Sequence, residues 1–185
     1  IGNEVVMDPW TFVNDELDIV EQKIWKEQLQ KRLMIWNCDI VMPWHKIADL
    51  AWTPNTSTGK WMTQVHAAKT SKCSIRFDDI LNEKWGNLEK SINLAFWPIV
   101  WEWKKYKNYT ELRNAIRPRY DALPEHLRIF LEHDDDRSRI EYVKSYLRTM
   151  AARIVPYRWN VNKKIKDWLD QQKVYIVESP QSFFL

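Results

Sequence analysis

Two cysteines and two histidines form the arrangement in this sequence that is closest to a metal site. Each cysteine lies seven positions from a histidine, in mirrored order along the chain. Thiolate and imidazole suit zinc, but zinc ligands usually come in pairs separated by about two to five residues. The wider spacing here favours buried or disulfide-paired cysteines with unrelated histidines. The weak metal candidates are Cys38, His45, His66 and Cys73.

Acidic side chains gather in two clusters that could hold a divalent cation. Mg²⁺ prefers carboxylate oxygens, and two carboxylates four positions apart share one face of a helix. Aspartates are also favoured at helix N-termini, where they accept hydrogen bonds from free amides. We therefore interpret both clusters as helix starts and keep a magnesium-dependent enzyme as an alternative. The residues concerned are Asp78, Asp79 and Glu83 in the first cluster and Asp134, Asp135 and Asp136 in the second.

The stretch 101–119 mixes aromatic and basic side chains and carries a net charge of +4. Cations neutralise phosphates and aromatic faces stack on bases, so a nucleic-acid-binding protein is a second alternative. An amphipathic helix with solvated lysines explains the same pattern. The candidate residues for binding a protein or a nucleic acid are Trp97, Trp101, Lys104, Lys105, Lys107, Tyr109, Arg113, Arg117 and Arg119.

Familiar catalytic and cofactor signatures are missing from the sequence. The segment Ser57-Thr58-Gly59-Lys60 is followed by Trp61, whereas a phosphate-binding loop needs an earlier glycine and a following Ser or Thr. The chain contains no H-E-x-x-H, G-x-S-x-G or G-x-G-x-x-G. We therefore expect no cofactor and favour a chain without catalytic activity.

Composition indicates helices as the elements that position these side chains. Only 3 of 185 residues are glycine, which leaves few positions free to take the positive φ angles of turn-rich β folds. We predict a mainly α chain, namely a single-domain irregular helical bundle with a few short peripheral β-strands. The domain covers residues 1–185, with a possible internal boundary in the loop 53–60.

Local signals place the elements of this bundle. Asp8 and Pro9 form a typical helix start, and the apolar pattern predicts a helix to about residue 32. Residues 33–42 form either a short buried strand or a continuation of that helix. Alternation predicts a strand over 72–77, and 173–177 is read as a terminal strand.

Two apolar stripes predict the core. One runs from residue 81 to 106, with a kink or break near residue 94 caused by Pro98. The other runs from residue 140 to 154 in a helix that follows the second acidic cluster. We expect the two to pack together through Leu81, Trp85, Leu88, Ile92, Ile140, Val143, Leu147 and Met150.

The 12 tryptophans are more than a core of this size readily absorbs. We expect exposure of at least three among Trp10, Trp44, Trp52, Trp61, Trp97, Trp101 and Trp159. Exposed aromatic surface is typical of interfaces. The sequence therefore predicts a non-catalytic structural or interaction subunit of a larger assembly, with protein partners or self-assembly, and nucleic acid as a possible partner. The net charge of +3 is small, no transmembrane segment is visible, and the compartment stays open.

Overall fold

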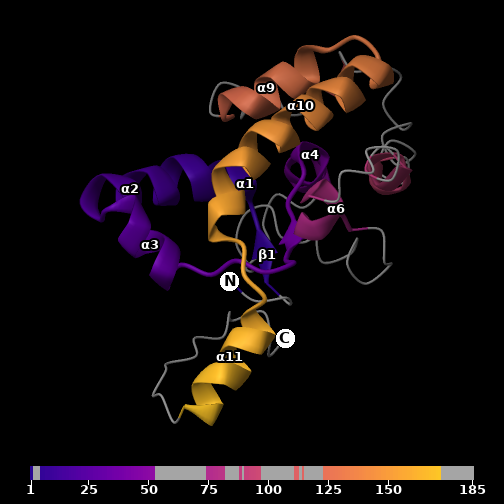
Figure 1. Cartoon of the computed structure of the whole chain (residues 1–185). Coiled ribbons are helices and arrows are strands. Elements are labelled where there is room, and N and C mark those ends of the chain that lie inside the picture. Colours follow the sequence, from indigo (N-terminus) through magenta and orange to yellow (C-terminus); the bar gives the residue numbers. More distant parts are fainter. Residues whose placement is uncertain are drawn as a thin grey trace.

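The computed structural model describes residues 1, 5–52, 74–81, 88, 90–96, 111–112, 114 and 123–171. These segments are mainly helical, which confirms the predicted fold class (Figure 1). Their one sheet is a parallel pair, β1 (Val6–Met7) and β2 (Asp39–Ile40), in which Val6 lies opposite Asp39 and Met7 opposite Ile40. The strands are short, as the composition indicates, but they lie at the centre of the molecule rather than at its edge.

The predicted N-terminal helix begins where expected and is broken once. Asp8 caps it by accepting a hydrogen bond from the Trp10 amide, and Pro9 is its first residue. At Ile24 the backbone becomes extended, with φ −128° and ψ 133°. The break directs Leu29 into the core while Trp25 is 78% exposed, so tertiary packing overrides the helical pattern. The resulting elements are α1 (Pro9–Thr11), the π-helical η1 (Phe12–Leu17), α2 (Asp18–Lys23) and α3 (Lys26–Arg32).

Residues 33–42 take the extended alternative. They form a single bridge from Ile35 to Arg158, then β2, and they lead into α4 (Pro43–Trp52). The strand predicted over 72–77 is not formed in its described part, residues 74–77, because Phe77 begins α6 (Phe77–Leu81); residues 72–73 lie outside the described residues. Arg76 keeps one antiparallel bridge to Asp39. The strand predicted over 173–177 lies outside the described residues.

The C-terminal half is built on two helices that lie side by side, α9 (Glu125–Glu132) and α10 (Asp136–Ile154) (Figure 1). Asp135 caps α10 by accepting a hydrogen bond of 2.8 Å from the Ser138 amide. The buried Arg139 donates to the His133 carbonyl and so fastens the turn between the helices. η2 (Val155–Tyr157) and α11 (Val161–Asp170) follow, and α11 lies below the other helices in this view.

One continuous core joins the two halves. The predicted packing of the two stripes is present among the described residues: Leu88, Ile92, Val143, Leu147 and Met150 are buried in one cluster. Leu81 and Ile140 are partly buried against it, and Trp85 lies outside the described residues.

The tryptophan prediction is only partly testable. Trp44 is not one of the exposed tryptophans: it is fully buried, because the aromatic rings of Phe96 and Phe130 pack against it. Trp10 is partly buried, and Trp159 is 38% exposed. The side chains of Trp52, Trp61, Trp97 and Trp101 lie outside the described part of the chain.

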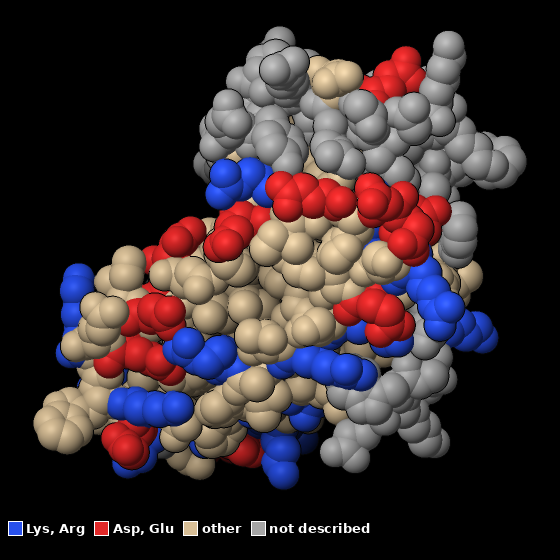
Figure 2. All heavy atoms as spheres, turned by 90° about the horizontal axis from the view of Figure 1, so that it is seen from above, with Lys and Arg blue, Asp and Glu red and all other residues tan. Residues whose placement is uncertain are grey.

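The described surface carries charges of both signs. On the face drawn in Figure 2, Lys and Arg side chains are interspersed with Asp and Glu. Within the described segments, no helix combines the length and the apolar character that crossing a membrane requires.

Candidate functional site

The carboxyl ends of β1 and β2 lie together, and a helix follows each of them. The Val41 amide donates a hydrogen bond of 2.8 Å to the Met7 carbonyl, which aligns the two strand ends. Asp8 follows β1 and caps α1, while Pro43 opens α4 directly after β2. Open α/β sheets place their functional sites at this edge of parallel strands. We therefore take the polar side chains gathered here as the candidate site.

A buried lysine lies at the centre of this site. The Lys46 ammonium forms an ion pair with the Asp8 carboxylate, and the lysine side chain is only 3% exposed. The same carboxylate accepts hydrogen bonds from the Trp10 amide at 3.2 Å and the Thr11 hydroxyl at 2.7 Å. An ammonium group this deeply buried needs a charged partner, because water no longer solvates it. Asp8 thus serves both as a helix cap and as the counter-charge of Lys46.

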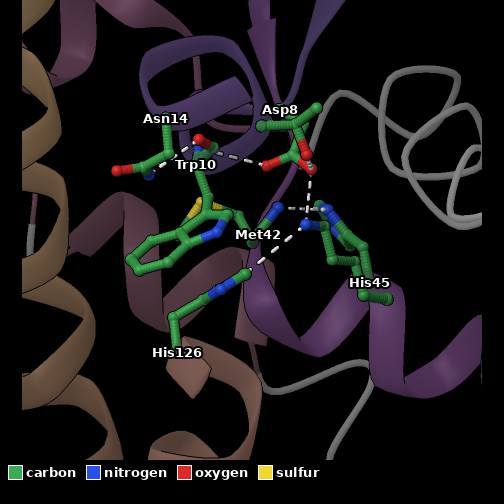
Figure 3. A network of polar contacts seen from close by, with 8 residues as sticks. Asp8, Trp10, Asn14, Met42, His45 and His126 are labelled. Carbon is green, nitrogen blue, oxygen red and sulfur yellow. Dashed lines mark hydrogen bonds and ion pairs between the residues drawn. The ribbon is translucent and has the colours of Figure 1, made fainter. Parts of the chain in front are cut away.

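His126 connects α9 and α10 to the site around Lys46. Its Nε2 atom lies 3.5 Å from the Lys46 Nζ atom. Its ring is stacked between Trp10, at a centroid distance of 4.5 Å, and Tyr146, at 5.6 Å. Figure 3 shows His126 beside the Trp10 ring. The site therefore joins the start of α1, α4, α9 and α10.

Burial keeps the His126 imidazole neutral. Loss of solvent, reinforced by the Lys46 cation, lowers the pKa of His126 to about 3, against an opposing effect of Asp8. A neutral Nε2 can accept a hydrogen bond from the lysine, which has only donors to offer. Asp8, Lys46 and His126 thus form a chain of contacts in which the Lys46 ammonium lies between a carboxylate and the neutral Nε2 atom of His126, while the buried Nδ1 atom of His126 has no hydrogen-bond partner among the described residues.

A second buried histidine fixes the turn after β2. The Nδ1 atom of His45 accepts a hydrogen bond of 3.1 Å from the Met42 amide. Burial lowers the pKa of His45 to about 3, so this acceptor stays unprotonated at neutral pH. Tyr142 completes the surroundings by donating its hydroxyl to the His126 carbonyl at 3.1 Å. These contacts fix geometry and hold protons in defined positions.

The weak zinc candidates are not brought together by the described structure. Cys38 is a buried free thiol, and burial raises its pKa to about 12, whereas zinc binds the thiolate. The Nδ1 atom of His45 is engaged by the backbone. His66 and Cys73 lie outside the described residues. Among the described residues, no three His, Cys, Asp or Glu side chains are grouped as metal ligands.

The acidic clusters lie at helix starts, as their interpretation required. Asp79 accepts a hydrogen bond of 2.8 Å from the Arg76 amide at the start of α6, and Asp78 pairs with Arg158 at 2.6 Å. Asp135 caps α10, and Asp136 lies 3.5 Å from Arg139. Glu83 lies outside the described residues.

The basic and aromatic binding candidates cannot be placed. All of them lie outside the described residues: Trp97, Trp101, Lys104, Lys105, Lys107, Tyr109, Arg113, Arg117 and Arg119. Their assignment as a binding surface therefore stays a prediction.

Comparison with known proteins identifies the class of protein to which this fold and site belong. The family model of adenylosuccinate synthetase matches residues 1–185, so the chain belongs to the adenylosuccinate synthetase family. Adenylosuccinate synthetase 2 of Trypanosoma cruzi is 33% identical over 199 residues, which cover 100% of this chain and 30% of the relative.

Two further relatives carry the same name. Adenylosuccinate synthetase of Trypanosoma brucei brucei is 28% identical over 196 residues. This alignment covers 100% of this chain and 31% of the relative. That of Leishmania infantum is 41% identical over 85 residues, or 45% of this chain and 12% of the relative. The chain thus spans about 30% of the length of the first curated relatives that it matches.

Family membership corrects the functional prediction. The non-catalytic structural or interaction subunit is wrong, because the family is one of enzymes. The comparisons also give no support to the expected protein partners, self-assembly or nucleic-acid partner. The prediction rested on the absence of short catalytic signatures, whereas the likeness to the family extends over the whole chain at about one residue in three.

Sequence reasoning also missed the site. Lys46 and His126 are 80 positions apart, and nothing in the spacing of either residue predicts their contact. The one available signal was Asp8 with Pro9, which located the helix start but not the lysine that the same carboxylate binds.

Proposed function

We propose that this chain takes part in the enzymatic formation of adenylosuccinate, the activity for which its relatives are named. The observation that supports the proposal is the family match across residues 1–185. It is strengthened by relatives whose alignments cover 100% of this chain.

Within that function, we assign the cluster of Asp8, Lys46 and His126 a positioning role. The three side chains fix the two turns that follow the parallel strands, and they hold α9 against α4. Rigid elements held by buried, complementary polar contacts are what a catalytic site needs around it. We therefore assign these residues to holding the two strand-end turns and α9 in place.

A chimera tests the proposed function directly. The segment of the Trypanosoma cruzi synthetase that aligns with this chain is replaced by the chain, and adenylosuccinate formation is followed by chromatography and mass spectrometry. We expect kcat/KM within about tenfold of the parent enzyme, which corresponds to about 1.4 kcal/mol of transition-state stabilisation.

The matched negative control carries Phe130→Asp in the same chimera. Phe130 is fully buried, so a carboxylate there destroys the core and the activity with it. The proposal fails if the unaltered chimera melts cooperatively and has a native circular dichroism spectrum, yet forms no more adenylosuccinate than this control.

A further inference from the structure

One titratable side chain, His126, lies among the buried residues through which α9 contacts the rest of the molecule, together with the apolar Leu127, Phe130 and Leu131. His126 is 2% exposed and lies in the first turn of α9. Through it, α9 contacts Trp10 of α1, Lys46 of α4 and Tyr146 of α10. A change in the charge of this ring therefore alters the contacts of α9 with α1, α4 and α10.

The charged and titratable groups around His126 come from four elements. Asp8 lies at the start of α1, Lys46 on α4, and Tyr142 and Tyr146 on α10. Glu125 is the adjacent residue of α9 itself, and it is exposed. The acidic group that pairs with Lys46 is Asp8, whose side chain is 18% exposed, and the Lys46 ammonium already occupies it.

Protonation of the imidazole would leave the cluster with two adjacent cations. The Nε2 atom would then carry a hydrogen facing the Lys46 ammonium, with the two nitrogens 3.5 Å apart. Neither group could accept a hydrogen bond from the other. Aromatic faces attract a cation, but like charges at this distance and out of water repel each other strongly.

We propose that Asp8, Lys46 and His126 form an acid-releasable latch, in which protonation of His126 frees α9 from α1 and α4 before the chain unfolds. The low pKa of His126, caused by burial and then by Lys46, agrees with this device. The latch is independent of the proposed enzymatic function, since it needs only the contacts within this chain. It predicts local opening of α9, with α10 and its buried seam still folded.

Amide hydrogen exchange at two acidities tests the latch. After correction for intrinsic rates, exchange in residues 127–132 should accelerate by at least about tenfold between pH 7 and about pH 4.5, while residues 143–151 stay protected. In parallel, the His126 ring is titrated by NMR. The proposal is overturned if both segments lose protection together, because that is global unfolding.

Two variants shift the release in opposite directions. Lys46→Met removes the like charge, so the His126 ring should titrate at higher pH and α9 should lose less of its protection in acid than in the wild type. Asp8→Asn removes the counter-charge, so release should begin in weaker acid. If Lys46→Met does not fold, the Asp8→Asn variant tests the proposal by itself: α9 release at the same pH as in the wild type, or at lower pH, contradicts it.

Controls separate the latch from general effects of charge. Lys163→Met removes an exposed lysine of α11 and should leave α9 exchange as in the wild type. His126→Gln cannot titrate and should make α9 exchange independent of acidity in this range. Acid release that persists unchanged in His126→Gln contradicts the proposal.

Discussion

The guanidinium of Arg153 lies 2.6 Å from an Asp18 carboxylate oxygen and so ties α10 to α2 across 135 positions. The same Nη2 atom of Arg153 also lies 2.7 Å from Glu21 Oε2. The other oxygen of Glu21 accepts a hydrogen bond from the hydroxyl of the buried Tyr157. Glu21 is thus the point at which the N-terminal helices, α10 and η2 are joined.

Replacing Glu21 should therefore weaken the fold more than replacing another glutamate of the same helical stretch. Glu21→Ala is expected to lower the free energy of unfolding by about 1–3 kcal/mol, because the Tyr157 hydroxyl loses its partner. The Arg153 and Asp18 side chains are partly exposed, so the contribution of the Arg153 ion pairs to that loss is small. Urea unfolding measures the loss. Glu16→Ala, an exposed site, should stay within about 0.5 kcal/mol, and equal losses for the two variants contradict the assignment.

Leu147 tests the seam between the two apolar stripes. The side chain is fully buried on α10, so Leu147→Ala should cost about 2–5 kcal/mol through lost burial and the remaining cavity. Leu169→Ala, on the 56% exposed Leu169 of α11, is the matched control and should have little effect. Thermal or denaturant unfolding compares them. A cost below about 0.5 kcal/mol for Leu147 would place it outside the core.

Acid should destabilise the chain through His45. Its pKa is about 3 in the folded chain against an ordinary value of 6.5, so the unfolded chain binds more protons between these values. The stabilisation is complete above about pH 6.5 and is lost as the pH falls toward 3, at up to about 1.4 kcal/mol per pH unit. Urea unfolding between about pH 7 and pH 4.5 measures the slope. His45→Gln should flatten it, and an unchanged slope in that variant rejects the assignment.

Cys38 should react slowly while the chain is folded. Its side chain is buried, and burial raises its pKa to about 12, so the reactive thiolate is scarce near pH 8. A Cys73→Ser background leaves Cys38 as the single thiol of the chain. Alkylation followed by mass spectrometry should be at least about 100-fold slower than in denaturant. Comparable rates in the two conditions would show that Cys38 is accessible.

Local chemistry was predictable from the sequence, and long-range contacts were not. Asp8 with Pro9 and the start of α10 follow from hydrogen bonds within one helical turn, so the residue types alone locate them. The break at Ile24 has no glycine or proline to announce it. It exists because the core takes Leu29 and leaves Trp25 in solvent, which is a property of the whole fold.

The candidate site was out of reach for the same reason. Lys46 has the pattern of an ordinary helix lysine, and His126 that of an isolated histidine. Their contact depends on how α4 and α9 pack, which a single sequence does not reveal. Family membership was equally hidden from a search for short signatures, because the match to the family extends over the full chain.

β2 has a consequence for the order in which the chain folds. It exchanges hydrogen bonds with residues 5–7 on one side, and on the other the Ile40 amide donates to the Ile75 carbonyl. Each side requires the closure of a loop of more than 30 residues, whereas α9 and α10 meet through a short turn. Closing long loops costs chain entropy before any contact compensates for it. We therefore expect the joining of residues 5–7, β2 and Ile75, rather than helix formation, to limit the rate of folding.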